Sequence, residues 1–129
     1  MEVVIWGANE LGRYVAKNMK REDIDIVPLA FVDNNHELQN TVIDKVDVIS
    51  YEDLKERKNL REITVLLAVK NAKNIFQILE QLDGTPVANV GIVKPKVGFS
   101  GLKVDPSQKE GNVIWSKFAG DTYRFLPRI

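Results

Sequence analysis

The sequence contains no cysteine, which excludes disulfide bonds and any zinc site built on thiolates. It also has no excess of charge of one sign, because 18 acidic side chains balance 18 basic ones. Binding to nucleic acid or to an anionic membrane needs a basic surplus, so neither partner is expected. No apolar stretch approaches the roughly 18 residues that a membrane span requires. Because the N-terminus also lacks a secretory signal, we expect a cytoplasmic protein.

The 129 residues suffice for one domain with its own hydrophobic core. Over the first 95 residues, short apolar segments alternate with helical patterns, which is typical of a parallel sheet with helical crossovers. The expected strands are residues 3–6, 26–32, 42–49, 63–69 and 87–93. The sequence therefore predicts an α/β fold, a three-layer Rossmann-like parallel sheet with strand order 3-2-1-4-5.

Two of these strands, residues 3–6 and 63–69, are almost continuously apolar, so we expect them in the centre, covered on both faces. Two amphipathic helices are expected between the strands. Their apolar faces consist of Leu11, Tyr14, Val15 and Met19 in the first helix and of Ala72, Ile75, Ile78, Leu79 and Leu82 in the second. Ser50 and Asp53 have the spacing of a capping box and predict a short third helix.

The sequence changes character after this region, because beyond Gly98 no helical or alternating pattern lasts. We therefore divide the chain into a Rossmann-like domain, residues 1–95, and an irregular tail or interdomain connector, residues 96–129. The tail holds five of the ten aromatic residues, which is unlike a disordered linker. We expect it to cover apolar surface on this domain, on a second copy or on a following domain, through Trp115, Phe118 and Phe125.

A glycine turn directly follows the first strand and leads into the first helix, where dinucleotide-binding folds carry Gly-x-Gly-x-x-Gly. Gly7 suits the tight turn and Gly12 suits close packing of the helix on the strand. Asn9 stands in place of the second glycine. Its side chain either obstructs a phosphate or caps the helix amides that would otherwise bind an anion. The candidate residues of this turn are Gly7, Ala8, Asn9, Glu10, Leu11 and Gly12.

Polar residues also follow two other strands at the same edge of the sheet. Asp33 and Asn34 end the second strand, at the position where a carboxylate recognises a ribose hydroxyl. Lys70 and Asn71 follow the fourth strand and would face the same crevice, where they could meet a phosphate. The competing interpretation is structural: Gly12 serves packing, Asp33 and Asn34 terminate a strand, and Lys70 and Asn71 start a helix.

Two features resemble catalytic groups without the partners that catalysis needs. Tyr51 and Lys55 match the Tyr-x-x-x-Lys pair of short-chain dehydrogenases, but they follow the third strand in a capped surface helix. His36 is the single histidine and lies in a polar loop without a nucleophile or metal partner. We expect neither to be catalytic and no metal to be bound.

Residues 3–13, with the later segments 31–34 and 66–69, resemble the N-terminal Rossmann-like domains of bacterial polysaccharide-biosynthesis enzymes, among them the nucleotide-sugar-binding domains of sugar O-acyltransferases. The resemblance implies that Gly7, Ala8 and Gly12 meet phosphates and that Asp33 lies near a sugar or ribose. The hexapeptide repeats of the acyltransferase part are absent. Residues 123–129 resemble the lead-in to a radical S-adenosylmethionine domain, which implies that this chain is the front of a larger enzyme.

The sequence thus favours a non-catalytic domain that binds a nucleotide or nucleotide-sugar and precedes a catalytic domain of the same polypeptide. One alternative is the NAD(P)-binding domain of an oxidoreductase. Another is a degenerate Rossmann fold used for docking or for formation of a homodimer. The cofactor remains open at this point between a nucleotide-sugar and NAD(P).

Overall fold

The computed structural model of the chain describes residues 2–19, 27–69, 71–93, 102–104, 115–118 and 121–127. Three α-helices and one 3-10 turn are described: α1 (Glu10–Met19), α2 (Tyr51–Lys55), α3 (Ala72–Leu82) and η1 (Leu60–Glu62). The described strands are β1 (Glu2–Trp6), β2 (Val27–Val32), β3 (Val42–Ile43), β4 (Val46–Ile49), β5 (Ile63–Leu67), β6 (Asn89–Ile92), β7 (Leu102–Val104), β8 (Trp115–Phe118) and β9 (Asp121–Pro127).

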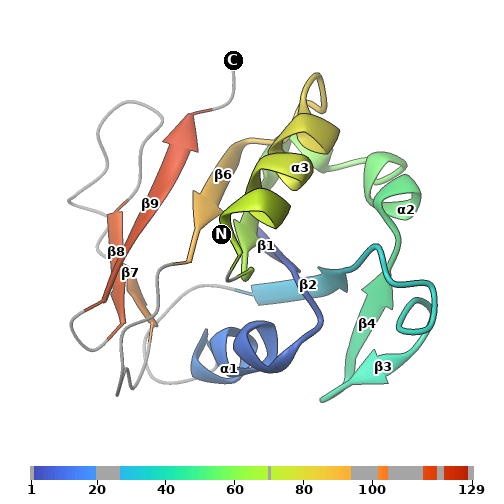
Figure 1. Cartoon of the computed structure of the whole chain (residues 1–129), viewed down its shortest axis with the longest axis horizontal. Coiled ribbons are helices and arrows are strands. Elements are labelled where there is room, and N and C mark those ends of the chain that lie inside the picture. Colours follow the sequence, from blue (N-terminus) through green and yellow to red (C-terminus); the bar gives the residue numbers. More distant parts are fainter. Residues whose placement is uncertain are drawn as a thin grey trace.

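The strands form one sheet in the order β3-β4-β2-β1-β5-β6-β9-β8-β7 (Figure 1). Its parallel part, β4-β2-β1-β5-β6, has the predicted order 3-2-1-4-5, with the first and fourth expected strands side by side. The α/β Rossmann-like class is therefore confirmed. The sheet differs from the prediction at its two ends, where antiparallel strands extend it.

One of these differences concerns the third expected strand, residues 42–49, which is a hairpin of β3 and β4. Asp44 and Lys45 both have positive φ angles, 50° and 68°. Two successive residues in this region make the turn that matches the twist of a two-residue hairpin. The expectation of one continuous strand was wrong because the apolar pattern continues through the turn and only the backbone conformation of these two residues breaks it.

The second difference concerns the tail, which was expected to be irregular beyond Gly98. Three strands lie there, and β9 pairs antiparallel with β6, from Asn89 with Pro127 to Ile92 with Arg124. Strand β8 pairs with β9 and β7 with β8, and β7 also lies against α1. The prediction of an irregular tail is thereby corrected. The short strands gain their hydrogen bonds from a pre-existing sheet edge, which a local pattern does not reveal.

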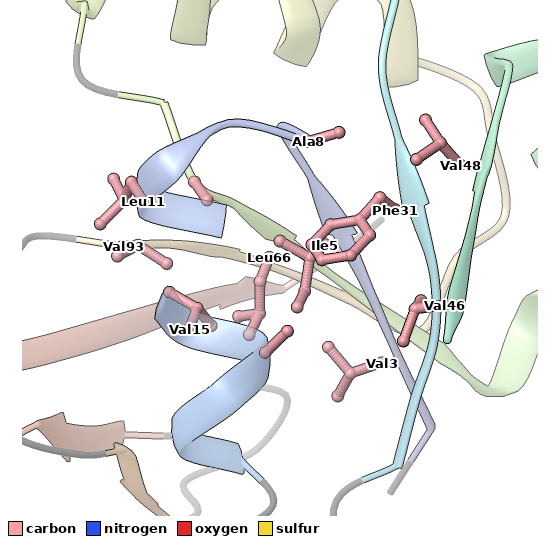
Figure 2. Packing of buried hydrophobic residues seen from close by; sticks show 12 residues of the cluster. Val3, Ile5, Ala8, Leu11, Val15, Phe31, Val46, Val48, Leu66 and Val93 are labelled. Carbon is pink, nitrogen blue, oxygen red and sulfur yellow. The ribbon is translucent and has the colours of Figure 1, made fainter. Parts of the chain in front are cut away.

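Apolar residues cover both faces of the central strands, as their continuous apolar sequence predicted. Along β1, Val3 and Ile5 pack on the α1 side, whereas Val4 and Trp6 pack on the side of α2 and α3. Figure 2 shows Val15 of α1 beside Leu66 and Leu11 beside Val93, all in the same cluster as Ile5. Because each large apolar side chain contributes about 1.5–3 kcal/mol when buried, these two layers hold the sheet between the helices.

The predicted apolar faces of the two long helices are confirmed in part, because Ala72 at the start of α3 is exposed. Leu11 and Val15 of α1 and Ile78 and Leu82 of α3 are buried. Helix α2 begins with the predicted capping box, in which Ser50 Oγ accepts from the Asp53 amide and the Asp53 carboxylate accepts from the Ser50 amide. Within the described part of the chain, no helix combines the length and apolar character that crossing a membrane requires.

The pairing of β9 with β6 leads to a prediction for the tail. Truncation after Pro95 removes β9 and leaves one edge of β6 without a strand partner, and unpaired edges promote aggregation. We expect the truncated protein to unfold at a lower temperature and to aggregate, measured by thermal unfolding and light scattering. Unchanged stability and solubility would mean that the tail is a passive linker.

Candidate functional site

The candidate site lies at the carboxyl edge of the parallel strands, where β1 and β5 are neighbours. The chain leaves β1 for α1 on one face of the sheet and leaves β5 for α3 on the other (Figure 1). Ligands of open α/β sheets bind in the crevice that such a reversal creates. The sequence predicted this location, because its candidate residues all follow the ends of strands.

Gly7 and Gly12 are both required by close approaches of the backbone. Gly7 has a φ of +122°, and a Cβ there would lie 2.6 Å from the Ala68 carbonyl oxygen. A Cβ on Gly12 would lie 1.8 Å from the Gly7 carbonyl oxygen. These distances agree with the tight-turn and helix-packing roles that the sequence predicts for the two glycines.

Asn9 connects the start of α1 with the end of the neighbouring strand. Its Oδ1 accepts a hydrogen bond from the Gly12 amide at 2.8 Å, which is the geometry of a helix N-cap. Its Nδ2 donates to the Ala68 carbonyl oxygen at 3.0 Å. Both ends of the Asn9 side chain are therefore engaged with backbone, and the capping role considered from the sequence is present.

Asp33, directly after β2, forms a hydrogen bond with the glycine turn. Its Oδ2 accepts a hydrogen bond from the Ala8 amide at 2.9 Å, and its Oδ1 accepts one from the Asn35 amide at 2.9 Å. The sequence placed Asp33 correctly at this edge but did not predict that it would bind the turn itself. A carboxylate offers about four lone-pair positions, so these two bonds leave Asp33 able to accept further hydrogen bonds.

Two hollows lie at this edge. The first has a volume of about 280 Å³ and is lined by Asn9, Glu10, Leu11, Val69, Asn71 and Asn74. The second has a volume of about 340 Å³ and is lined by Trp6, Asn9, Asp33, Asn34, Val69, Asn74, Gln77 and Ile78. Asn9, Val69 and Asn74 line both, so the hollows adjoin. Most of the polar residues that line them are asparagine or glutamine.

The first hollow is bordered by the starts of two helices. Asn71 caps α3, since its Oδ1 accepts from the amides of Lys73 and Asn74. At α1, no described residue accepts a hydrogen bond from the Glu10 or Leu11 amide, as is usual in a first helical turn. The other predicted residue of this part, Lys70, lies outside the described residues.

Sequence reasoning missed three residues on α3. Asn74 and Gln77 line the hollows, and Gln81 forms paired hydrogen bonds with Asn34. Their spacing of three and then four residues puts them on one face of a helix. This stripe of carboxamides was visible in the sequence, but only the fold shows that it faces the loop after β2.

The Tyr51–Lys55 pair and His36, which resembled catalytic groups in the sequence, do not line either hollow. The Tyr51 hydroxyl is 2.6 Å from Thr85 Oγ1, and Lys55 Nζ lies 4.8 Å above the Tyr51 ring. A hydrogen bond to Glu52 raises the pKa of Lys55, so it is held as an ammonium on the surface. His36 is exposed in the loop after β2, and no cluster of metal-ligating side chains occurs among the described residues.

The two hydrogen bonds of Asn9 predict the effect of replacing it with glycine. Asn9→Gly loses the bond to Ala68 O, worth about 0.5–1.5 kcal/mol, and a cap worth a few tenths of a kcal/mol over glycine. We expect the free energy of unfolding to fall by about 1–2 kcal/mol in urea titrations. Asn9→Asp is the control for the bond to Ala68, because it keeps the cap and loses the Nδ2 donor. A Gly variant as stable as the parent would mean that neither bond contributes.

Comparisons with known proteins show what the chain as a whole is similar to. The family model described as C2185-like, N-terminal, matches residues 1–83. The crystal structure of UDP-D-quinovosamine 4-dehydrogenase from Vibrio fischeri is similar, with a TM-score of 0.62 and 28% sequence identity. The similarity covers 74% of this chain and 79% of that chain.

A search of curated proteins finds no match. By its name this dehydrogenase acts on a nucleotide-sugar, which is the broader group of enzymes to which the sequence resemblance pointed. Because the family model covers well over half of the sequence, this chain belongs to the C2185-like N-terminal family.

Proposed function

We propose that the chain binds a nucleotide, specifically a nucleotide-sugar, in the two hollows at the carboxyl edge of its sheet. The observation that carries the proposal is the first hollow, which is lined by Glu10 and Leu11 at the start of α1 and by Asn71 and Asn74 at the start of α3. The Glu10 and Leu11 amides have no acceptor among the described residues. They are therefore available to a ligand.

The first hollow suits the diphosphate of such a ligand. Helices α1 and α3 have 10 and 11 residues and present the positive ends of their dipoles at this edge. Backbone amides at a helix start bind phosphate without a cationic side chain. We also propose that Asn71 and the adjacent Lys70 contact the diphosphate.

The second hollow suits the nucleoside. Asp33 lines it and has the capacity to accept hydrogen bonds from ribose hydroxyls beyond the two it already accepts. Trp6 and Ile78 supply apolar surface beside the polar groups. With the diphosphate in the first hollow and the nucleoside in the second, the lining residues of both hollows have a role in binding.

The similarity to a nucleotide-sugar enzyme supports this ligand class. The side chains that line the hollows are amides, carboxylates and apolar groups, with no serine or cysteine nucleophile. We propose that the domain binds the nucleotide-sugar while a downstream domain of the same polypeptide acts on it, and that two copies form a homodimer. The sequence resemblance to the binding domains of sugar O-acyltransferases supports the same ligand.

The alternative is that the cofactor is NAD(P). It is favoured by the solved neighbour being a dehydrogenase and by the glycine turn lying at the end of β1. A dinucleotide would use the same amides, so the two ligands compete for one site.

The test is a calorimetric and thermal-shift comparison of UDP-sugars, UDP, UMP, NAD⁺ and NADP⁺. A ligand at 100 times its dissociation constant adds about 2.7 kcal/mol to stability. We expect the UDP-sugar to bind more tightly than NAD⁺ or NADP⁺. Tighter binding of a dinucleotide would support the alternative, and binding of none of them would leave the fold as a docking module.

A variant pair tests the proposed diphosphate site. Glu10→Pro removes one backbone donor at a helical position that tolerates proline, whereas Glu10→Ala keeps the donor. We expect the proline variant alone to bind UDP about 10- to 100-fold more weakly, the value of a hydrogen bond to a charged group. Equal binding by the two variants would contradict the proposed amide site.

A further inference from the structure

A pair of carboxamides lies beside the second hollow. Asn34 Nδ2 donates to Gln81 Oε1 at 3.0 Å, and Gln81 Nε2 donates to Asn34 Oδ1 at 3.2 Å. The two residues are 47 positions apart, one directly after Asp33 and the other at the end of α3. Asn34 lines the second hollow, whereas Gln81 lies outside its lining.

This pair shows what the Asn34 side chain is able to bind. Gln81 offers a planar group in which a carbonyl oxygen stands beside an N–H, and Asn34 meets it with its donor and its acceptor together. A nucleobase edge has the same arrangement of a donor beside an acceptor. Asparagine and glutamine read such edges through two hydrogen bonds. Gln81 therefore occupies Asn34 as a base edge would.

The surroundings of Asn34 fit an uncharged heterocycle. The other polar groups of the second hollow, apart from Asp33, are the neutral carboxamides of Asn9, Asn74 and Gln77. No cationic side chain of the described residues lines it. Asp33, the residue that we propose for the ribose, immediately precedes Asn34, so a base attached to that ribose would lie within reach of Asn34.

We infer that Asn34 reads the edge of the nucleobase and that Gln81 holds Asn34 in the empty site and is displaced when the base binds. This inference rests on the proposed function. The Asn34–Gln81 pair is exposed, and water competes for the hydrogen bonds of exposed amides, so little free energy opposes its opening. Gln81 then acts as a competitor of the base. If the pair were purely structural, Asn34 and Gln81 would both support binding, and loss of either would weaken it.

Variants of the two residues separate these possibilities, because the inference predicts a loss of base binding for Asn34→Ala and no loss for Gln81→Ala. The affinities to be measured by calorimetry are those of the four ribonucleoside monophosphates and of ribose 5-phosphate, which lacks the base. The association constant of the tightest-binding monophosphate, divided by that of ribose 5-phosphate, defines the base contribution. We expect Asn34→Ala to lower this ratio by about 10- to 100-fold. We expect Gln81→Ala to leave the ratio unchanged or to raise it about 2- to 5-fold.

Glu80→Ala is the matched control, since Glu80 is exposed beside Gln81 on α3 and lines neither hollow. Circular dichroism of all variants checks that the fold is kept. Equal weakening by Asn34→Ala and Gln81→Ala would overturn the inference in favour of a structural pair. A parent protein that binds nucleotides with no base contribution would overturn the inference and leave the proposed function standing. Failure of every nucleotide and nucleotide-sugar to bind would overturn both.

Discussion

Gly12→Ala should strongly destabilise the protein, because the new Cβ would lie 1.8 Å from the Gly7 carbonyl oxygen. The substitution also improves helix propensity by about 1 kcal/mol. The cost of the clash exceeds this gain, because the neighbouring oxygen belongs to the backbone of a turn. A hydrogen bond from the Gly7 amide to the Val32 carbonyl oxygen holds that turn in place. We expect a net loss of roughly 3–5 kcal/mol, a large share of the 5–15 kcal/mol typical of a domain. Urea unfolding followed by circular dichroism measures it.

Gly84→Ala is the control for Gly12. Gly84 has a φ of +78° but nothing within 4 Å of its Cβ position, so only backbone strain opposes the change. Strain of this kind costs about 1–3 kcal/mol, and we expect a value at the lower end of that range. A Gly12→Ala protein as stable as the parent would contradict the close packing of α1 on the turn.

Asp33→Ala should have the second largest effect, because one side chain supports two backbone segments. Its oxygens accept from the amides of Ala8 and Asn35, both at 2.9 Å. Hydrogen bonds to a charged group contribute about 1.5–3 kcal/mol each, and water replaces part of this at a half-buried position. We expect the free energy of unfolding to fall by about 2–3 kcal/mol and nucleoside binding to be lost. Unfolding in urea and calorimetry with UMP measure the two effects.

Two further variants make the Asp33 result interpretable. Asp33→Asn keeps one acceptor but turns an amino group toward the second amide, so we expect an intermediate loss of stability. Asp47→Ala, an exposed carboxylate on β4, should change stability by no more than about 0.5 kcal/mol. If Asp33→Ala resembled Asp47→Ala, the two hydrogen bonds would be replaceable by water.

The parallel core of the fold followed from local sequence features. The apolar run of residues 3–6 could be buried on both faces only in a strand between two helical layers, and that is where β1 lies. Gly7, Asn9 and Asp33 were located because the carboxyl ends of parallel strands share one edge. The handedness of the crossovers then fixed the strand order.

The partners of these residues came from the tertiary structure alone. Asn9 meets Ala68 across 59 positions, Asp33 meets Ala8 across 25, and Asn34 meets Gln81 across 47. A sequence pattern records what a residue prefers within a few neighbours, whereas a hydrogen bond between distant segments depends on how the elements pack. The hairpin at Asp44 and the strands of the tail escaped prediction because a turn conformation and a free sheet edge decided them.

The sequence by itself thus determined the class of fold and the edge of the sheet at which the candidate residues gather, because burial and strand ends are local properties. The tertiary structure decided which amides stay available, which carboxylate is already engaged and which carboxamide faces the hollow. Hydrogen bonds require their two atoms to lie about 3 Å apart, and only the folded chain brings distant residues to that separation.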